Sequence, residues 1–487
     1  MYFDLETALT TTGRMAARPY QAAKHFLPLF HYQPLAAVAR ILRAMDGLAK
    51  IEDLGRPRVV IVGGGFGGLA LAQSLAGAPV QVVLLDKQNY HTFQPLLYQL
   101  ATAGLDADAI VAPFRKVLHT QANFFFRLAE VQKVNTEQQV VETSIGLVRY
   151  DYLVLATGAT ANYLGKADMA QNAITLKSVE DAIELRNTVL AGFEKALQLG
   201  DEQELNSLLD FVIVGGGPTG VEIAGALSEL RDHVLPRDYP ELDFKQMDIH
   251  LVQSGPLLLK GMSAHASQKA LDYLHGFGVK VWLDCRVESY DGYTAVLNNG
   301  QQLVTRTLIW AAGVTGAPVQ GLRPECLLKG NRYRVNEFNQ IDGYDNIFAI
   351  GDIAAMPSAA YPDGHPMVAQ PALQQGRLLG RNLLRLLRQQ SPQPFAYDDK
   401  GSMATIGRNH AVADIRLFGR DLHLGGFLAW LAWSLVHVLA LITFRNRLTV
   451  LANWGYSYFS ADKGLRYIIG KTRVPMKAEP GQAKAMQ

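Results

Sequence analysis

Val-Val-Ile-Val-Gly-Gly-Gly-Phe-Gly-Gly occupies residues 59–68, and Phe-Val-Ile-Val-Gly-Gly-Gly-Pro-Thr-Gly occupies residues 211–220. Each stretch is a short apolar run that leads into a Gly-x-Gly-x-x-Gly turn and then into a segment with helical periodicity. In such a unit the first glycine makes the tight turn, the second lets the backbone approach a pyrophosphate, and the third allows helix and strand to pack closely. The phosphates then lie at the helix N-terminus, where free amides favour an anion. Two copies therefore predict two dinucleotide-binding folds in one chain.

The candidate nucleotide-binding residues follow from these two motifs. The second strand of each unit is expected to end in an acid that accepts hydrogen bonds from ribose hydroxyls. Residues 81–86 end in Asp86, which is followed by Lys87, whereas Gln253 stands at the corresponding place in the second copy. A carboxylate would repel a 2′-phosphate and Gln253 would not, so the second site leaves NADPH open beside NADH. The glycines of the two turns complete the set: Gly63, Gly65, Gly67, Gly68, Gly215, Gly217 and Gly220.

Three further apolar strands end in small residues or in an acid. Residues 151–158 end in Ala-Thr-Gly and residues 308–313 in Ala-Ala-Gly, so Thr157, Gly158 and Gly313 permit close approach of a cofactor. Plain buried strand ends are the alternative interpretation. Residues 346–352 end in Gly351 and Asp352, whose carboxylate suits a ribitol hydroxyl, and a helix N-terminus is expected next to face phosphate. At strands of this kind a chain returns to a nucleotide-binding domain, and their order predicts that one dinucleotide domain is interrupted by the other.

Three segments carry a more specific resemblance. Residues 89–105 (NYHTFQPLLYQLATAGL), 176–182 (LKSVEDA) and 369–376 (AQPALQQG) resemble stretches of the type II NADH dehydrogenases, the single-subunit NADH:quinone oxidoreductases. From residue 57 to about 385 the chain is also similar to the wider family of flavoproteins with two dinucleotide-binding domains. The resemblance implies that the first domain holds FAD non-covalently and that the second holds a nicotinamide nucleotide.

The resemblance also implies roles for individual residues. Ala369, Gln370 and Gln374 would border the flavin ring and a quinone, where uncharged amides hydrogen-bond carbonyl oxygens without titrating. Glu180 would be the carboxylate between the nicotinamide and quinone pockets, and Glu222 would contact NADH. Taken from the residues alone, Glu180 equally suits a helix-capping or dipole role, and Glu222 suits a first-turn dipole role.

The domain organisation follows from the nested motifs. The fold class is α/β, with two nested Rossmann-like dinucleotide-binding domains for FAD and NAD(P)H and a C-terminal helical membrane-anchoring region. The expected segments are a helical extension (1–55), the first part of the FAD-binding domain (56–175), the NAD(P)H-binding domain (176–315), the second part of the FAD-binding domain (316–400) and the amphipathic anchoring region (401–487).

The C-terminal region is typical of a segment that lies on a membrane. Residues 401–487 carry 11 Lys/Arg against 4 Asp/Glu, and residues 425–444 contain no Asp, Glu, Lys or Arg. Ser434 and His437 dilute the apolar character, which favours an interfacial helix over a true span, with burial in the protein or in a homodimer as a third interpretation. Aromatic and basic residues after position 444 favour an anionic lipid surface.

The composition narrows the remaining possibilities. The chain has 487 residues, 49% of them hydrophobic and 18% charged, which excludes coiled coil and wholesale disorder. Two separated cysteines, Cys285 and Cys326, exclude four-cysteine iron–sulfur and zinc sites and a CxxC dithiol, and they suit a reducing compartment. No secretory signal begins the sequence, and neither a metal nor a nucleic-acid partner is expected.

The resulting expectation is a non-proton-pumping NADH:quinone oxidoreductase that passes a hydride from NADH to FAD and two electrons to a lipid-soluble quinone. In a bacterium it would be a peripheral protein on the cytoplasmic face of the inner membrane. The alternatives are a soluble NAD(P)H oxidase or ferredoxin reductase, a sulfide:quinone oxidoreductase with catalytic cysteines, and a redox-sensing flavoprotein that binds a partner without turnover.

Overall fold

A computed structural model of the chain describes residues 47–417, 420–460, 462–470 and 472. The structure divides into two units, of which the first is Met1–Lys50 with Gly146–Val148. Within this unit, Leu48 and Leu147 form an isolated parallel β-bridge, and the Ala49 N–H donates to the Leu147 carbonyl at 2.9 Å. Most of the helical extension predicted over 1–55 lies outside the described residues. The second unit, Ile51–Ile145 with Arg149–Gln487, contains the two dinucleotide folds.

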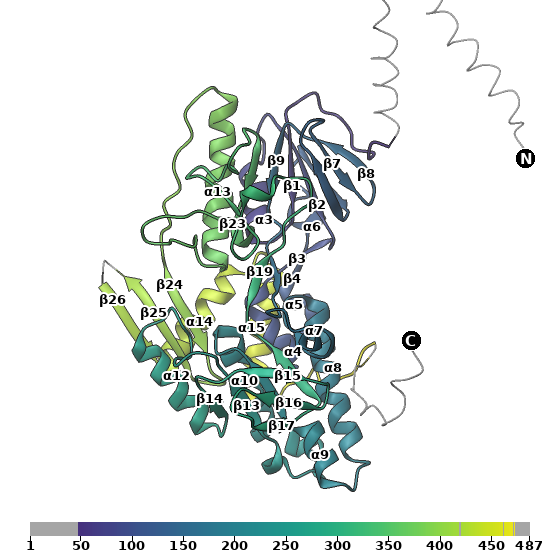
Figure 1. Cartoon of the computed structure of the whole chain (residues 1–487), viewed down its shortest axis with the longest axis vertical. Coiled ribbons are helices and arrows are strands. Elements are labelled where there is room, and N and C mark those ends of the chain that lie inside the picture. The colour runs from purple at the N-terminus through teal and green to yellow at the C-terminus, as the bar shows by residue number, and fades with distance from the viewer. Residues whose placement is uncertain (1–46, 418–419, 461, 471, 473–487) are drawn as a thin grey trace, which may run out of the picture. The chain divides into compact units, whose positions relative to one another are not determined.

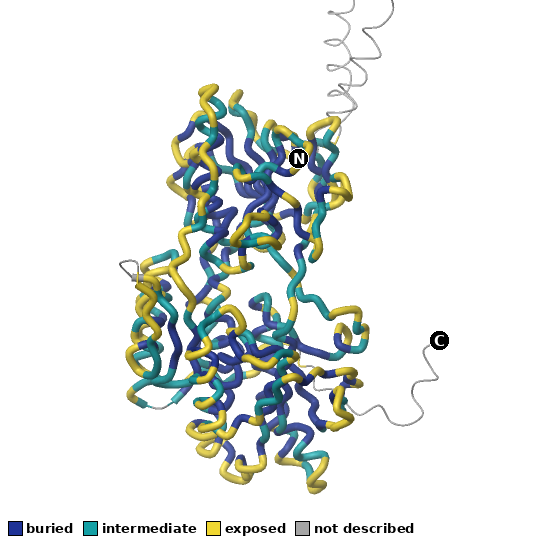
Figure 2. The backbone as a smooth tube through the Cα atoms, turned by 60° about the vertical axis from the view of Figure 1, so that its left-hand side comes forward, coloured by how far each residue is buried: buried dark blue, intermediate teal, exposed yellow. Residues whose placement is uncertain are grey.

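Five parallel strands form the first sheet of this second unit, in the order β22-β9-β1-β2-β5. Val59, Val60 and Ile61 of the central strand are fully buried, as expected of a parallel strand that is covered on both faces. Figure 2 shows the central strands as buried. The strands are β1 (Arg58–Val62), β2 (Gln81–Asp86), β5 (Phe124–Leu128), β9 (Tyr152–Leu155) and β22 (Ile347–Ala349).

Two helices that are distant in sequence pack together beside this sheet, α3 (Phe66–Ser74) and α13 (Ala369–Leu387) (Figure 1). Gly376 and Gly380 make this close packing possible. A Cβ at Gly376 would overlap the Gly67 carbonyl, and a Cβ at Gly380 would overlap the Ser74 hydroxyl.

The second sheet repeats the pattern, with five parallel strands in the order β11-β18-β12-β13-β14. Phe211, Val212 and Ile213 of its central strand are fully buried. The strands are β11 (Ile174–Thr175), β12 (Phe211–Val214), β13 (Ile249–Val252), β14 (Lys280–Trp282) and β18 (Thr307–Trp310), and the main helices are α8 (Val179–Ala196), α9 (Glu202–Leu209), α10 (Pro218–Glu229) and α12 (Ala264–Gly276).

The nesting predicted from the sequence is confirmed by the strand order. The chain leaves the first sheet after β9, builds the second sheet, and returns to pair β22 with β9. The outgoing strand β10 (Ala159–Ala161) pairs antiparallel with the returning strand β19 (Val314–Gly316). Asp352 lies in the three-residue 3₁₀ turn Gly351–Ile353, and the next helix, α13, begins 17 residues later at Ala369. That this helix N-terminus faces phosphate stays a prediction.

Smaller elements connect the two sheets and flank them. They are β3 (Tyr90–Thr92), α4 (Leu97–Ala101), α5 (Ala107–Ile110), β4 (Val111–Pro113), α6 (Phe114–Val117), β6 (Val131–Asn135), β7 (Val140–Thr143), β8 (Gly146–Arg149), α7 (Ala167–Asn172), α11 (Leu235–Asp238), β15 (Val287–Tyr290), β16 (Thr294–Leu297), β17 (Gln302–Val304), β20 (Leu327–Leu328), β21 (Arg332–Arg334) and β23 (Ala354–Ala355).

The C-terminal region is an antiparallel sheet followed by a helical hairpin (Figure 1). The sheet contains β24 (Gly401–Thr405), β25 (Ala411–Leu417) and β26 (Arg420–Gly425), and the hairpin contains α14 (Phe427–Ala440) and α15 (Phe444–Ser460). The apolar segment 425–444 thus contains all of α14 and ends at the first residue of α15. Among the described residues, no helix combines the length and the apolar content needed to cross a bilayer.

Candidate functional site

The first glycine turn, between β1 and α3, is shaped for a pyrophosphate. Gly63 has φ +100°, and a Cβ there would collide with the Ala156 carbonyl, while a Cβ at Gly68 would collide with the Gly63 carbonyl. A Cβ at Gly65, in contrast, would meet nothing within 4 Å, so the backbone at this position faces open space. Gly67 faces α13, since its Cβ would lie 3.2 Å from the Ala372 carbonyl. The turn is therefore packed on the protein side and open at the helix N-terminus, which fits a dinucleotide phosphate.

Asp86 anchors this turn from the end of β2. Its Oδ2 accepts a hydrogen bond from the Gly64 N–H at 2.5 Å, and its Oδ1 accepts from the Gln88 N–H at 2.8 Å. Burial raises the pKa of Asp86, and these two backbone donors oppose the rise. Lys87 points elsewhere, to an exposed ion pair with Glu130 at 2.8 Å. Asp86 therefore holds the turn, whereas the Lys87 side chain lies on the surface.

The second glycine turn repeats this arrangement between β12 and α10. A Cβ at Gly215 would lie 2.8 Å from the Ala311 carbonyl oxygen, a Cβ at Gly220 would collide with Gly215, and a Cβ at Gly217 would meet nothing within 4 Å. Gln253 takes the place of Asp86, because its Oε1 accepts from the Gly216 N–H at 2.9 Å. The amide therefore supplies the acceptor that the turn requires and brings no negative charge to the ribose position.

The ends of the returning strands lie beside these turns. Thr157 connects the outgoing chain with the returning chain, because its hydroxyl donates to the Ala317 carbonyl at 2.7 Å. Gly158 has φ +70° and a Cβ there would meet nothing within 4 Å, whereas a Cβ at Gly313 would lie 2.9 Å from the Asn162 carbonyl. Gly158 thus opens toward free space, and Gly313 packs against the chain.

Asp352 lies between two cations at the end of the first sheet. Burial raises its pKa, and the positive charges of Lys177 and Arg332 oppose that rise. Burial also lowers the pKa of Lys177, and Asp352 and Asp181 oppose this. Gly351, with φ +74°, donates its N–H to Gln375 Oε1 at 2.7 Å. The Gly-Asp turn is therefore fixed from α13, and its carboxylate is balanced by positive charge.

Glu180 lies in the first turn of α8, as the dipole interpretation expected, and it also connects two parts of the chain. The capping box of α8 is formed by Ser178 and Asp181, so Glu180 has no part in it. Its Oε1 instead accepts from the Tyr90 hydroxyl at 3.0 Å and from Gln88 Nε2 at 3.2 Å. Glu180 thus connects the start of α8, next to the second sheet, with residues that follow Asp86 in the first fold.

The glutamines of α13 divide into different environments. Gln374 Nε2 donates to the Asp398 carbonyl at 2.9 Å and its Oε1 accepts from the Asp398 N–H at 3.0 Å, so this amide holds the segment that leads to β24. Gln375, which was not singled out, is 1% exposed and holds Gly351. Gln370 is half-buried, next to Ala369 at the first turn of α13, and its amide has no hydrogen-bond partner among the described residues. Gln370 is therefore better placed than Gln374 to bind a substrate oxygen.

Glu222 is buried in the second turn of α10, so its predicted first-turn dipole role is wrong. The Thr405 backbone hydrogen-bonds its carboxyl, which faces the C-terminal sheet. Burial raises the pKa of Glu222 well above its usual range, which favours a neutral acid. Contact between Glu222 and NADH stays a prediction.

The two cysteines have the character of structural thiols. Cys285 and Cys326 are each 5% exposed, and their thiols lie 3.3 Å from Asn298 Oδ1 and 3.2 Å from the Asp342 carbonyl. Burial raises the pKa of both thiols. Catalytic cysteines require the opposite shift, so these residues do not suit sulfide oxidation.

The hairpin exposes apolar side chains and buries polar ones. Ser434 and Trp433 of α14 are 9% and 1% exposed, and His437, whose pKa burial lowers to about 4, donates from Nδ1 to the Trp433 carbonyl at 2.7 Å. The polar positions of α14 therefore face the protein. The outward side chains are Phe427, Leu428, Leu431, Leu435, Val436 and Leu439 of α14 and Phe444, Leu448, Leu451 and Phe459 of α15.

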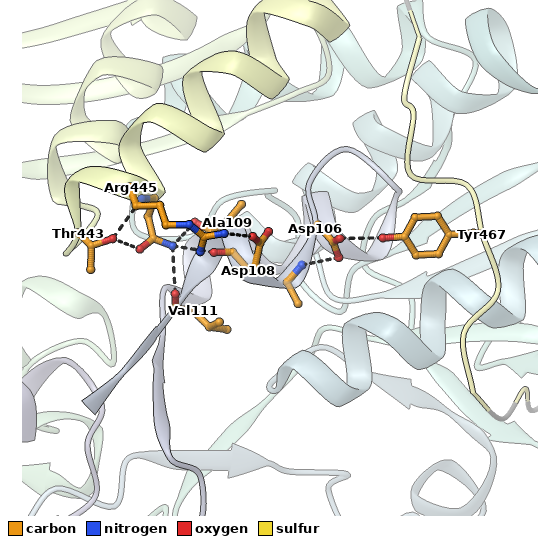
Figure 3. A network of polar contacts seen from close by, with 9 residues as sticks. Asp106, Asp108, Ala109, Val111, Thr443, Arg445 and Tyr467 are labelled. Carbon is orange, nitrogen blue, oxygen red and sulfur yellow. Dashed lines mark hydrogen bonds and ion pairs between the residues drawn. The ribbon is translucent and has the colours of Figure 1, made fainter. Parts of the chain in front are cut away.

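Polar contacts attach the hairpin to the loop around α5 (Figure 3). Asn446 Nδ2 donates to the carbonyls of Asp108, Ala109 and Val111 at 2.9, 2.8 and 3.0 Å. These carbonyls lie at the C-terminal end of a short helix, where intrahelical donors are lacking. Tyr467, beyond the hairpin, donates to Asp106 Oδ2 at 2.7 Å.

Comparison with known proteins places this geometry in a family. Residues 57–376 match the pyridine nucleotide-disulphide oxidoreductase family, and residues 400–461 match the NDH2 C-terminal domain. The chain is 35% identical to the type II NADH:quinone oxidoreductase Ndh of Mycobacterium tuberculosis, over 87% of this chain and 94% of that protein. It is 34% identical to NdhA of the same organism, over 84% and 89%. NDH2 of Plasmodium falciparum, solved in complex with NADH, shares the fold with a TM-score of 0.77 at 21% identity, over 85% of this chain and all of that one.

Proposed function

Because the chain belongs to the type II NADH:quinone oxidoreductases, we propose that it passes electrons from NADH to a lipid-soluble quinone through bound FAD, without pumping protons. The observation that carries the proposal is the pair of glycine turns, each open at its second glycine and each held by a side chain from the next strand. When bound, FAD supplies the redox chemistry, as the acceptor of a hydride and the donor of two electrons.

The residues of the first fold hold FAD in this proposal. The turn from Gly63 to Gly68 binds the pyrophosphate at the N-terminus of α3, and Asp86 accepts from the adenosine ribose. Asp352 accepts from the ribitol, with Gly351 and the Thr157–Gly158 strand end close to the cofactor. All of these residues lie within 56–175 and 316–400, the two parts predicted for the FAD-binding domain.

The residues of the second fold, 176–315, hold NADH. The turn from Gly215 to Gly220 binds its pyrophosphate, Gln253 faces its ribose, and Gly313 lies at the strand end near the nicotinamide. Glu180 lies where the two folds meet, and Tyr90 and Gln88 fix the orientation of its carboxylate toward this junction. The amide at position 253 leaves NADPH as a second donor.

The quinone reaches the site beside the first turn of α13. Gln370 donates to a quinone oxygen, while Gln374 keeps α13 attached to the chain that leads into the C-terminal sheet. The two amides do not titrate, so the quinone side of the site keeps its charge over the physiological pH range.

Steady-state oxidation of NADH and NADPH with a short-chain quinone tests the activity, and two variants test the two sites separately. A Cβ at Gly65 or Gly217 meets no protein atom within 4 Å, so a side chain there enters the space assigned to a pyrophosphate. Gly65→Val is expected to lose FAD, and Gly217→Val to retain FAD but lose its reduction by NADH. Gly276→Val, at another position where a Cβ meets nothing, is the control and should behave as the wild type. Reduction of FAD by NADH without quinone turnover would instead indicate a reductase for a soluble acceptor.

The outward apolar face of the hairpin binds the membrane surface in this proposal. Leu435 and Leu439 are each 59% exposed, and the Lys/Arg excess of residues 401–487 favours anionic lipids. In a bacterium this is the cytoplasmic face of the inner membrane. A second copy of the chain is the competing occupant of the same face, and a monomeric mass in solution would exclude a constitutive homodimer.

Flotation with anionic liposomes measures this binding. Leu435→Asp is expected to reduce the bound fraction about tenfold or more, since burying one leucine contributes about 1.5–3 kcal/mol. Leu257→Asp changes a leucine that is 51% exposed outside the hairpin, and it should bind as the wild type does.

A further inference from the structure

Arg332 of β21 makes a concentrated set of hydrogen bonds at the edge of the first fold. Its guanidinium donates to four backbone carbonyls: Asp352 from Nε at 3.0 Å, Asp363 from Nη1 at 3.1 Å, and Ala354 and His365 from Nη2 at 2.6 and 2.9 Å. The residue is 6% exposed. A buried arginine of this kind is stable only with its donors satisfied, and here the backbone satisfies them.

The four carbonyls belong to two limbs of one loop. Asp352 and Ala354 lie on the outgoing limb, directly after β22, and Asp363 and His365 lie on the returning limb, which leads into α13. The turn at Gly364 brings the limbs close, since a Cβ there would lie 2.9 Å from the Ala355 Cα. The aromatic rings of Tyr361, Phe395 and Tyr397 pack around His365. Arg332 therefore fastens the two limbs to each other.

The loop connects two parts of the proposed site. Its outgoing limb carries the Asp352 carboxylate, and its returning limb precedes Ala369 and Gln370 at the start of α13. Gln375 fixes the same turn from the other side through the Gly351 N–H. Arg332 thus connects the turn that carries the ribitol acid with the limb that leads to the quinone-facing amide.

We propose that Arg332 is a positioning residue for the FAD and quinone side of the site: it holds the loop 352–365 so that Asp352 faces the cofactor and Gln370 faces the quinone. This inference rests on the proposed function, because it assigns Arg332 to the same FAD and quinone site. It predicts a selective defect. In the described part of the chain, none of the Arg332 hydrogen bonds reaches the glycine turn at Gly215, so NADH binding is expected to be unaffected.

Arg332→Lys is the direct test, because lysine keeps the charge but cannot reach four carbonyls with a planar fork. The dissociation constant of FAD, measured by flavin fluorescence, is expected to rise about tenfold or more, as the net loss of one or two hydrogen bonds implies. The KM for quinone should rise by a similar factor, while the KM for NADH stays within about twofold. Arg306→Lys is the matched control, since Arg306 is 5% exposed and contacts Ser207 and Glu204 near the second sheet. It should lower the melting temperature without changing FAD binding.

Hydrogen exchange of the wild type tests the same idea without a substitution. If Arg332 organises the loop, residues 352–365 stay protected after FAD is removed from the full-length protein, while the open glycine turn at 63–68 loses protection. A loop that exchanges freely without FAD would overturn the proposal, as would a folded Arg332→Lys protein with unchanged FAD and quinone constants. A wild type that binds no FAD would refute the proposed function instead.

Discussion

Replacement of Asn446 by alanine tests how the hairpin is attached to the dinucleotide folds. Asn446 is 4% exposed, and its amide hydrogens are shared among the carbonyls of Asp108, Ala109 and Val111 (Figure 3). Loss of these donors removes about two net hydrogen bonds and leaves buried carbonyls unpaired, which together cost about 3 kcal/mol. The free energy of local opening should fall by this amount, because α15 and the α5 loop separate more easily.

The assay is hydrogen exchange of the peptides that contain α5 and α15. A change of 3 kcal/mol corresponds to exchange that is about a hundredfold faster at these amides. Asn446→Asp keeps the shape but turns a carboxylate toward three carbonyl oxygens, so it should open the contact at least as much. Asp108→Ala is the control, because it removes only the exposed ion pair with Arg445 and leaves the Asp108 carbonyl in place. Exchange within threefold of the wild type in both Asn446 variants would refute the reasoning.

Three further substitutions address the nucleotide site and the pH dependence of stability. Gln253→Glu keeps the acceptor for the Gly216 N–H but places a negative charge opposite a 2′-phosphate. The ratio of kcat/KM for NADH to kcat/KM for NADPH should therefore rise about tenfold or more. An unchanged ratio would contradict the placement of Gln253 at the ribose. Because burial raises the pKa of Glu222 in the folded protein, the wild type loses stability as the pH rises above about 4.3, the pKa of a glutamate in the unfolded chain. Glu222→Gln should therefore melt at a higher temperature than the wild type at pH 8 but not at pH 4, and its KM for NADH should stay within twofold. A large loss of NADH affinity would instead support a contact between Glu222 and NADH. Burial raises the pKa of Asp210 to about 7. The advantage of Asp210→Asn in melting temperature should therefore grow between about pH 4 and 7 and then level off, and a constant difference would show that titration is not its cause.

The sequence was sufficient for the nested architecture, because the glycine turns and strand ends are local patterns with a fixed geometric purpose. Asp86 and Gln253 were identified from their place at the end of a strand. Their hydrogen bonds to Gly64 and Gly216 were not anticipated, since they depend on a side-chain orientation that only the folded turn determines.

Residues whose partners are distant in sequence were harder to predict. Asp181 stands at the capping-box spacing, three residues after Ser178, and completes the box of α8. The partners of Glu180, in contrast, are Gln88 and Tyr90, about 90 residues away, and no local pattern indicates them. Arg332 and Gln375 act through backbone atoms of a loop, so no motif marks them. A helical region was expected here from the composition, but the break between Ala440 and Phe444 that makes it a hairpin has no glycine or proline to signal it.

The interruption of one fold by the other sets an order of events on the ribosome. The strands of the second sheet are complete in the nascent chain once Trp310 has emerged, whereas the first sheet still lacks β22 and its companion helix α13. At about 5–20 residues per second, the chain up to Leu387 takes roughly 4 to 15 seconds longer. During that interval β9 has an unpaired edge and α3 an uncovered face, so the first fold is the aggregation-prone half of the nascent protein. The cofactor can add to a finished pocket only afterwards, and the hairpin of α14 and α15 is synthesised after α13.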